Sequence, residues 1–122
     1  MSIAGPEAAR FILNSFPSVW SLEVLLHLVR SGAPMPRHKI VEALRASDAI
    51  IANSVESFLI AGLIIEDEDG VRYQPASPDL ALHVRETERI YRERPDSVRR
   101  LIVRRSAGGL TAFSDAFNLR GE

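Results

Sequence analysis

Hydrophobic positions recur every three or four residues along most of the chain, which is the pattern of amphipathic helices. In the first half, proline, serine and glycine residues punctuate this pattern at intervals of about 10–15 residues. These residues divide the first half of the chain into four predicted helices: 6–16, 19–31, about 36–45 and 48–61. The second is apolar around most of its circumference, so we expect it at the centre of the fold.

The helix predicted over 48–61 is amphipathic, because Ile51, Val55 and Phe58 follow the i, i+4, i+7 spacing of one helix face. The period then changes from helix to strand. Residues 63–67 and 71–75 read as two strands joined through an Asp-Gly pair, which is a strong signal for a hairpin turn. We therefore predict that a helix runs directly into an antiparallel β-hairpin.

The rest of the chain, 77–122, predicts further helices and no strand. A long helix carries an apolar seam, and Pro95 breaks it. Helix then resumes, and a last short helix follows Gly108-Gly109 over about 110–120. The seam recurs at spacings of four, three and four, and its residues are Leu80, Val84, Thr87 and Tyr91. Such a seam either packs on the core or pairs two chains.

These patterns predict a single domain over 1–122, with a core region over 18–76 and a C-terminal helical extension over 77–122. The fold class is mainly α with a small β-hairpin. We predict that six side chains are buried together in the core: Trp20, Leu25, Leu44, Val55, Phe58 and Leu63.

The order from residue 18 to 75 is helix, short extended piece, helix, helix and hairpin. With Phe58, the run Ala61-Gly62-Leu63-Ile64 and the turn Asp69-Gly70, this order resembles the winged helix-turn-helix family, in particular MarR-like bacterial transcriptional regulators. The resemblance implies a winged helix flanked by an N-terminal helix and a C-terminal helical extension. The function that it implies, and that we expect, is a sequence-specific DNA-binding transcriptional regulator that reads two DNA half-sites as a homodimer.

In such regulators the third helix of the winged helix enters the major groove, and the hairpin, or wing, lies along the DNA backbone. The resemblance places Asn53, Glu56 and Ser57 at base-contacting positions. Asn53 has the amide that pairs with adenine, and Glu56 could accept from cytosine. The phosphate contacts would come from cations beside that helix: Arg37, Lys39 and Arg72.

The charge distribution departs from the family pattern. Residues 46–61 contain no Arg or Lys, and the wing tip carries four consecutive carboxylates, 66–69. Net charge is −4 over 62–79 and +4 over 80–105. Leu59 and Ile60 are apolar where DNA-binding relatives carry polar residues, so they require cover from the extension or a second subunit. The alternative function is a winged-helix protein-interaction module that has lost DNA binding and meets its partner through the wing tip.

Other classes of function find little support in the sequence. The chain has no cysteine, which excludes disulfides, thiolate metal sites and a Cys nucleophile. We find no catalytic constellation, metal-ligand set or cofactor motif, so we expect neither an enzyme nor a cofactor. No apolar run approaches the ~18 residues of a membrane span, and no signal peptide is recognisable, so we expect a cytoplasmic protein without membrane contact.

Overall fold

A computed structural model describes residues 6–104 of the chain. Within that range the sequence forms six helices and one hairpin. The last helix, over 95–104, is called the 95–104 helix below. The other elements, in chain order, are α1 (Pro6–Ser15), α2 (Val19–Ser31), α3 (Arg37–Leu44), α4 (Asp48–Ala61), β1 (Ile64–Asp67), β2 (Gly70–Tyr73) and α5 (Pro78–Glu93). The last helix predicted from the sequence, about 110–120, lies outside the described residues.

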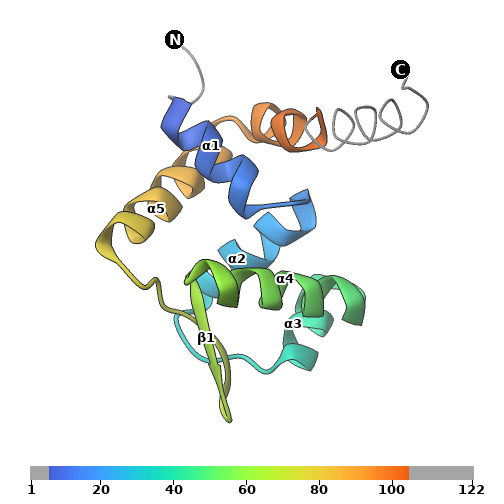
Figure 1. Cartoon of the computed structure of the whole chain (residues 1–122). Coiled ribbons are helices and arrows are strands. Elements are labelled where there is room, and N and C mark those ends of the chain that lie inside the picture. Colours follow the sequence, from blue (N-terminus) through green and yellow to red (C-terminus); the bar gives the residue numbers. More distant parts are fainter. Residues whose placement is uncertain (1–5, 105–122) are drawn as a thin grey trace, which may run out of the picture.

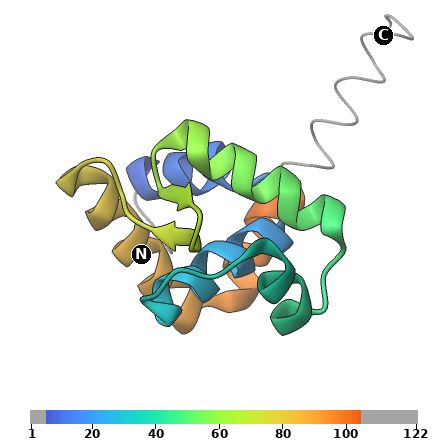
Figure 2. The same cartoon turned by 90° about the horizontal axis from the view of Figure 1, so that it is seen from below.

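The fold class predicted from the sequence is confirmed: the chain is mainly helical with one small antiparallel sheet. Helices α2, α3 and α4 with the hairpin make a winged-helix-like arrangement (Figure 1). Seen from the wing side, α3 and α4 lie on one side of the hairpin and α5 on the other (Figure 2). The 95–104 helix lies at the end of the molecule opposite the wing (Figure 1).

Serine residues start three of the helices, as their side chains accept backbone hydrogen bonds that the first helical turn leaves unpaired. The Ser18 Oγ accepts from the Ser21 amide at 3.2 Å, and the Ser21 Oγ accepts from the Ser18 amide at 3.3 Å. Ser47 and Ser77 cap α4 and α5 in the same way. These caps confirm the predicted helix starts, and α4 has the bounds that its hydrophobic period predicted.

The wing is held to the segment before α3 by an isolated β-bridge. Its own register pairs Ile64 with Tyr73 and Asp67 with Gly70. The segment before α3 adds to it at Met35, which exchanges two 2.9 Å backbone hydrogen bonds with Val71. The extended piece predicted before α3 therefore contacts the sheet through this single bridge. The strands themselves are shorter than the predicted 63–67 and 71–75.

The turn of the hairpin differs from its prediction. Glu68 and Asp69 occupy the turn, and Gly70 follows as the first residue of β2 with a φ of +124°. A Cβ at Gly70 would lie 2.5 Å from the Met35 carbonyl carbon and 2.5 Å from the Pro36 nitrogen. The glycine is thus required for the close approach of the backbone at Met35 and Pro36, as well as for its own backbone conformation.

Four of the six predicted core side chains, Leu25, Val55, Phe58 and Leu63, are fully buried. Leu44 is only partly buried, at the edge of the core. Burial of Trp20 was predicted wrongly, because this side chain is 45% exposed. It lies in the first turn of α2, where its ring borders an open cleft.

No single helix among the described residues is both long enough and apolar enough to cross a membrane. Only α1 and α2 taken together would meet those two requirements, and they are bent by 98° relative to each other.

Candidate interaction surface

The outward side of α4 carries the residues predicted to contact bases. Asn53 and Glu56 are exposed and Ser57 is half-buried, while Val55 and Phe58 face the core on the other side. Asn53, Glu56 and Ile60 follow the i, i+3, i+7 spacing, so they form one stripe along the helix. This stripe contains an amide, a carboxylate and an aliphatic group, and no cation.

Arg37, predicted to contact phosphate, is held by the wing. Its Nε lies 2.8 Å from Glu66 Oε2 and its Nη2 lies 2.7 Å from Glu66 Oε1, which is a bidentate pair. The hydrogen bond from Arg37 lowers the pKa of Glu66. The same hydrogen bond raises the pKa of Arg37, and the charge of Glu56 adds to this rise. Arg37 therefore lies between the wing and the outward stripe of α4.

Arg72 has a similar partner on the neighbouring strand. Its Nη2 lies 3.6 Å from Asp67 Oδ2, while Asp67 Oδ1 accepts a 2.9 Å hydrogen bond from the Asp69 amide in the turn. Two of the three cations predicted to bind phosphate are thus paired with wing carboxylates. The third, Lys39, is exposed on α3.

The region from α3 to the wing is acidic as a whole. Residues 37–72 contain four Arg or Lys and seven Asp or Glu, a net charge of −3. Neutralising phosphate groups with cations supplies nearly all sequence-independent affinity for DNA. A surface of this charge does not supply that attraction.

The end of α4 adds an apolar contact area. Leu59 is 38% exposed and Ile60 is 88% exposed, and neither α5 nor the 95–104 helix covers them. We use the name α4–wing surface for this region; it comprises Asn53, Glu56, Leu59, Ile60, Arg37 and the wing residues 66–69.

The apolar seam of α5, by contrast, is used within the chain. Val84, Thr87 and Tyr91 are buried, and Leu80 packs partly buried against the core. The hydroxyl group of Tyr91 donates a hydrogen bond to the Glu23 carboxylate on α2. Of the two roles that the sequence left open for this seam, packing on the core is the one it has here.

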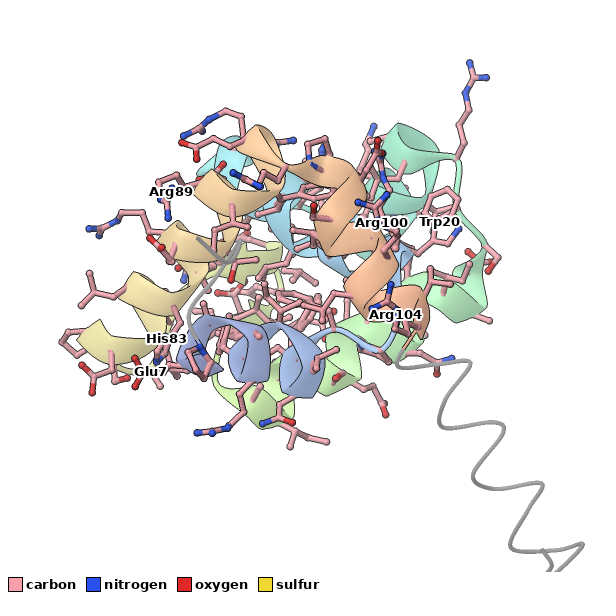
Figure 3. The ribbon with its side chains drawn as sticks, turned by 90° about the horizontal axis from the view of Figure 1, so that it is seen from above. Glu7, Trp20, His83, Arg89, Arg100 and Arg104 are labelled. Atoms are coloured by element: carbon pink, nitrogen blue, oxygen red, sulfur yellow. The ribbon has the colours of Figure 1, made fainter. Side chains whose placement is uncertain are left out.

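The arginines of the C-terminal region are mostly compensated by neighbouring acids. Arg89 pairs with Glu86 and, at 2.9 Å, with Glu93. Arg99 lies 3.2 Å from Asp96, and its guanidinium carbon lies 5.5 Å from the centre of the Tyr91 ring. Figure 3 shows Arg100 and Arg104 on the exposed side of the 95–104 helix.

Two hollows were not foreseen from the sequence, because each is lined from helices far apart in the chain. One is an acid-lined hollow of about 500 Å³ beside His83, whose ring stacks on Phe11 with centroids 5.0 Å apart. No group of three or more His, Asp or Glu in the range 6–104 could hold a metal ion. The other is an open cleft of about 420 Å³, lined by Val19, Trp20, Glu23, Ala43, Leu44 and Arg99.

Comparison of the chain with protein-family models, with curated proteins and with solved structures finds no match. The function is therefore inferred from side-chain chemistry and geometry.

Proposed function

We propose that this chain is a winged-helix module that binds another protein through its α4–wing surface. The observation that carries the proposal is the pairing of Arg37 and Arg72 with carboxylates of the wing itself. In a DNA-binding winged helix these guanidinium groups would face phosphate. Here they orient the wing through their carboxylate partners. The other two wing carboxylates, Glu68 and Asp69, point outward.

The chemistry of the surface indicates the kind of partner. Protein–protein interfaces typically have few charges at their core and polar groups at their rim. Ile60 offers the apolar contact at the centre of such an interface. The acidic wing tip would meet basic side chains of the partner, since opposite charges steer association. We expect the module to act in the cytoplasm.

Sequence-specific DNA binding is the second candidate, and the exposure of Asn53 on α4 favours it. Its amide offers the only bidentate pairing with adenine on the outward stripe, worth about 1–3 kcal/mol of discrimination. Breaking an exposed ion pair such as Arg37–Glu66 costs only about 0–1 kcal/mol, so DNA could recruit Arg37. Lys39 and Arg72 would supply the other phosphate contacts.

Binding to random-sequence and genomic duplex fragments at low and high salt separates the two candidates. We expect no measurable binding of the unmodified chain. Replacing residues 66–69 together with Ser removes four negative charges and releases Arg37 and Arg72 from their partners. Detectable binding that weakens with salt would then show that the wing carboxylates are what keeps phosphate away. Specific binding by the unmodified chain that Asn53→Ala relaxes at one base position would overturn the interaction module.

Site-specific photo-crosslinking in cells tests the interaction module directly. A photoreactive residue in place of Ile60 should give a discrete crosslinked protein. The matched control is the same residue in place of Leu82, which is 56% exposed on α5 and lies outside the α4–wing surface. The crosslink should disappear when residues 66–69 are changed to Ser. Equal crosslinking at both positions would contradict a specific interface.

A further inference from the structure

The cleft beside Trp20 is an apolar site with compensated charges at its rim. Val19, Ala43 and Leu44 give it apolar walls, and the Trp20 ring is 45% exposed. Its two charged residues are already engaged: the Glu23 carboxylate accepts from Tyr91, and Arg99 pairs with Asp96. The main cost of burying a charged group is the loss of its water when no partner replaces that water. Because both charged residues of the cleft already have partners, an apolar side chain that enters the cleft would not incur this cost.

The described part of the chain ends with the helix that borders this cleft. Arg99 lines it and also lines a second hollow, of about 310 Å³, along Arg100, Val103 and Arg104. The two hollows therefore adjoin at Arg99 and form a track along the 95–104 helix. Figure 3 shows Trp20 and Arg100 on the same side of the molecule, with Arg104 further along the helix. Val103, which is 58% exposed, adds an apolar group to this track.

The sequence supplies an apolar segment immediately after this helix. Eighteen residues follow Arg104, and the helix predicted over 110–120 places Leu110, Phe113 and Phe117 on one face at the i, i+3, i+7 spacing. Those side chains need an apolar surface to cover them. Among the described residues, the open apolar surface that adjoins this segment is the track formed by the hollow along Arg100, Val103 and Arg104 and the Trp20 cleft.

The connection is long enough to return to the cleft. Residues 105–109, which include two glycines, can span up to about 17 Å when extended. Arg99 lies only about 7.5 Å back along the helix from Arg104, at 1.5 Å per residue. Glycine accepts the backbone conformations that a reversal of chain direction needs.

We propose that the segment 110–120 occupies the Trp20 cleft of its own chain, with Phe113 and Phe117 against Trp20 and Leu44. The C-terminal segment thereby joins α2, α3 and the 95–104 helix at the end of the molecule opposite the wing. This inference is independent of the function proposed for the α4–wing surface.

The single tryptophan of the chain reports on this contact. In the full chain, Trp20 fluorescence should have a short-wavelength emission maximum and weak quenching by acrylamide. Phe113→Ala with Phe117→Ala should shift the emission to longer wavelength and increase the quenching. The control is Thr111→Ala with Asp115→Asn, on the opposite side of the predicted helix, which should leave both unchanged. Identical emission and quenching in the wild type and the Phe113/Phe117 variant would overturn the proposal.

Two further measurements distinguish a cleft filled by the segment of its own chain from one filled by a second copy. Dilution should leave the emission unchanged if the segment binds within its own chain, and a shift to longer wavelength on dilution would assign the cleft to a second copy and overturn the proposal. Because the chain has no cysteine, Ala43→Cys with Phe113→Cys should give an intramolecular disulfide on oxidation. Ala43→Cys with Thr111→Cys should give far less, and equal yields would overturn the proposal even where the alanine variant unfolds.

Discussion

Gly70 is the residue whose identity the wing tolerates least. A methyl group there would overlap the backbone of Met35 and Pro36, which cannot move without breaking the bridge between Met35 and Val71. We predict that Gly70→Ala lowers the free energy of unfolding by about 2–4 kcal/mol.

Gly32→Ala is the matched control, because Gly32 also has a positive φ, +67°, but nothing lies within 4 Å of its added Cβ. Gly32→Ala should lower the free energy of unfolding only by the cost of placing an alanine at a positive φ, about 1–2 kcal/mol. Chemical denaturation measures both variants. Equal losses would show that the contact with Met35 and Pro36 is easily relieved.

Phe58 and Leu59 are neighbours in sequence with opposite environments. Phe58 is fully buried with its ring centroid 5.8 Å from that of Phe16, whereas Leu59 is 38% exposed. Phe58→Ala should cost about 3–5 kcal/mol, from lost transfer energy and a cavity. Leu59→Ala should cost well under half of that. A denaturation difference below about 1 kcal/mol for Phe58→Ala would place Phe58 outside the cooperative core.

Trp20 shows what residue type cannot predict. Its size and apolarity favour the core, and its position in a mostly buried helix supports the same conclusion. Whether it is covered depends on α3 and the 95–104 helix, which meet α2 only in the folded molecule. Val55 and Phe58 were predictable because their environment follows from the period of their own helix.

At the scale of elements, the sequence predicted the helices and the hairpin because the signals are local. Serine caps, the ends of helices and the change of hydrophobic period each depend on a few neighbouring residues. The pairing of Arg37 with Glu66 joins residues that are 29 positions apart, so no local sequence pattern predicts it. The same holds for the bridge between Met35 and Val71.

The Arg37–Glu66 pair ties α3 to the wing, and a double-mutant cycle measures it. With Arg37→Ala and Glu66→Ala, we predict a coupling of about 0.2–1 kcal/mol at pH 7, because both side chains remain partly in water. The pKa of Glu66 is lowered in the folded chain, so the stabilisation exists above the pKa of the unfolded chain and is lost as the pH falls through the lower folded value.

The coupling should therefore fade as the pH is lowered below about 4. Arg30–Glu88, a single 3.7 Å contact between α2 and α5, is the comparison pair and should couple more weakly. A coupling for Arg37–Glu66 that persists unchanged into acid would show that the interaction does not depend on the charge of Glu66.

For the whole molecule, the homodimer predicted from the sequence stays a prediction, and the structure changes the residues on which it would depend. Val84 and Tyr91 are buried in the core of their own chain. Leu59 and Ile60 therefore remain as the uncovered apolar pair of the α4–wing surface. Any self-association at micromolar concentration should be lost in Ile60→Ser and kept in Leu82→Ser, as measured by sedimentation. It should strengthen with salt, since two acidic wings repel each other. Association lost equally in both variants would contradict this placement.

The pairing of Met35 with Val71 has a consequence for local opening. An isolated two-stranded hairpin is marginally stable in water, and this one gains a third partner at Val71, the second residue after its turn. The amides of Met35 and Val71 should therefore exchange with deuterium slowly, in step with the core of α2. The amides of Glu68 and Asp69 should exchange orders of magnitude faster, through opening of the turn that leaves the Met35–Val71 bridge closed. The turn residues of the wing can then adapt their shape to a bound molecule while its two strands stay fixed to the segment before α3.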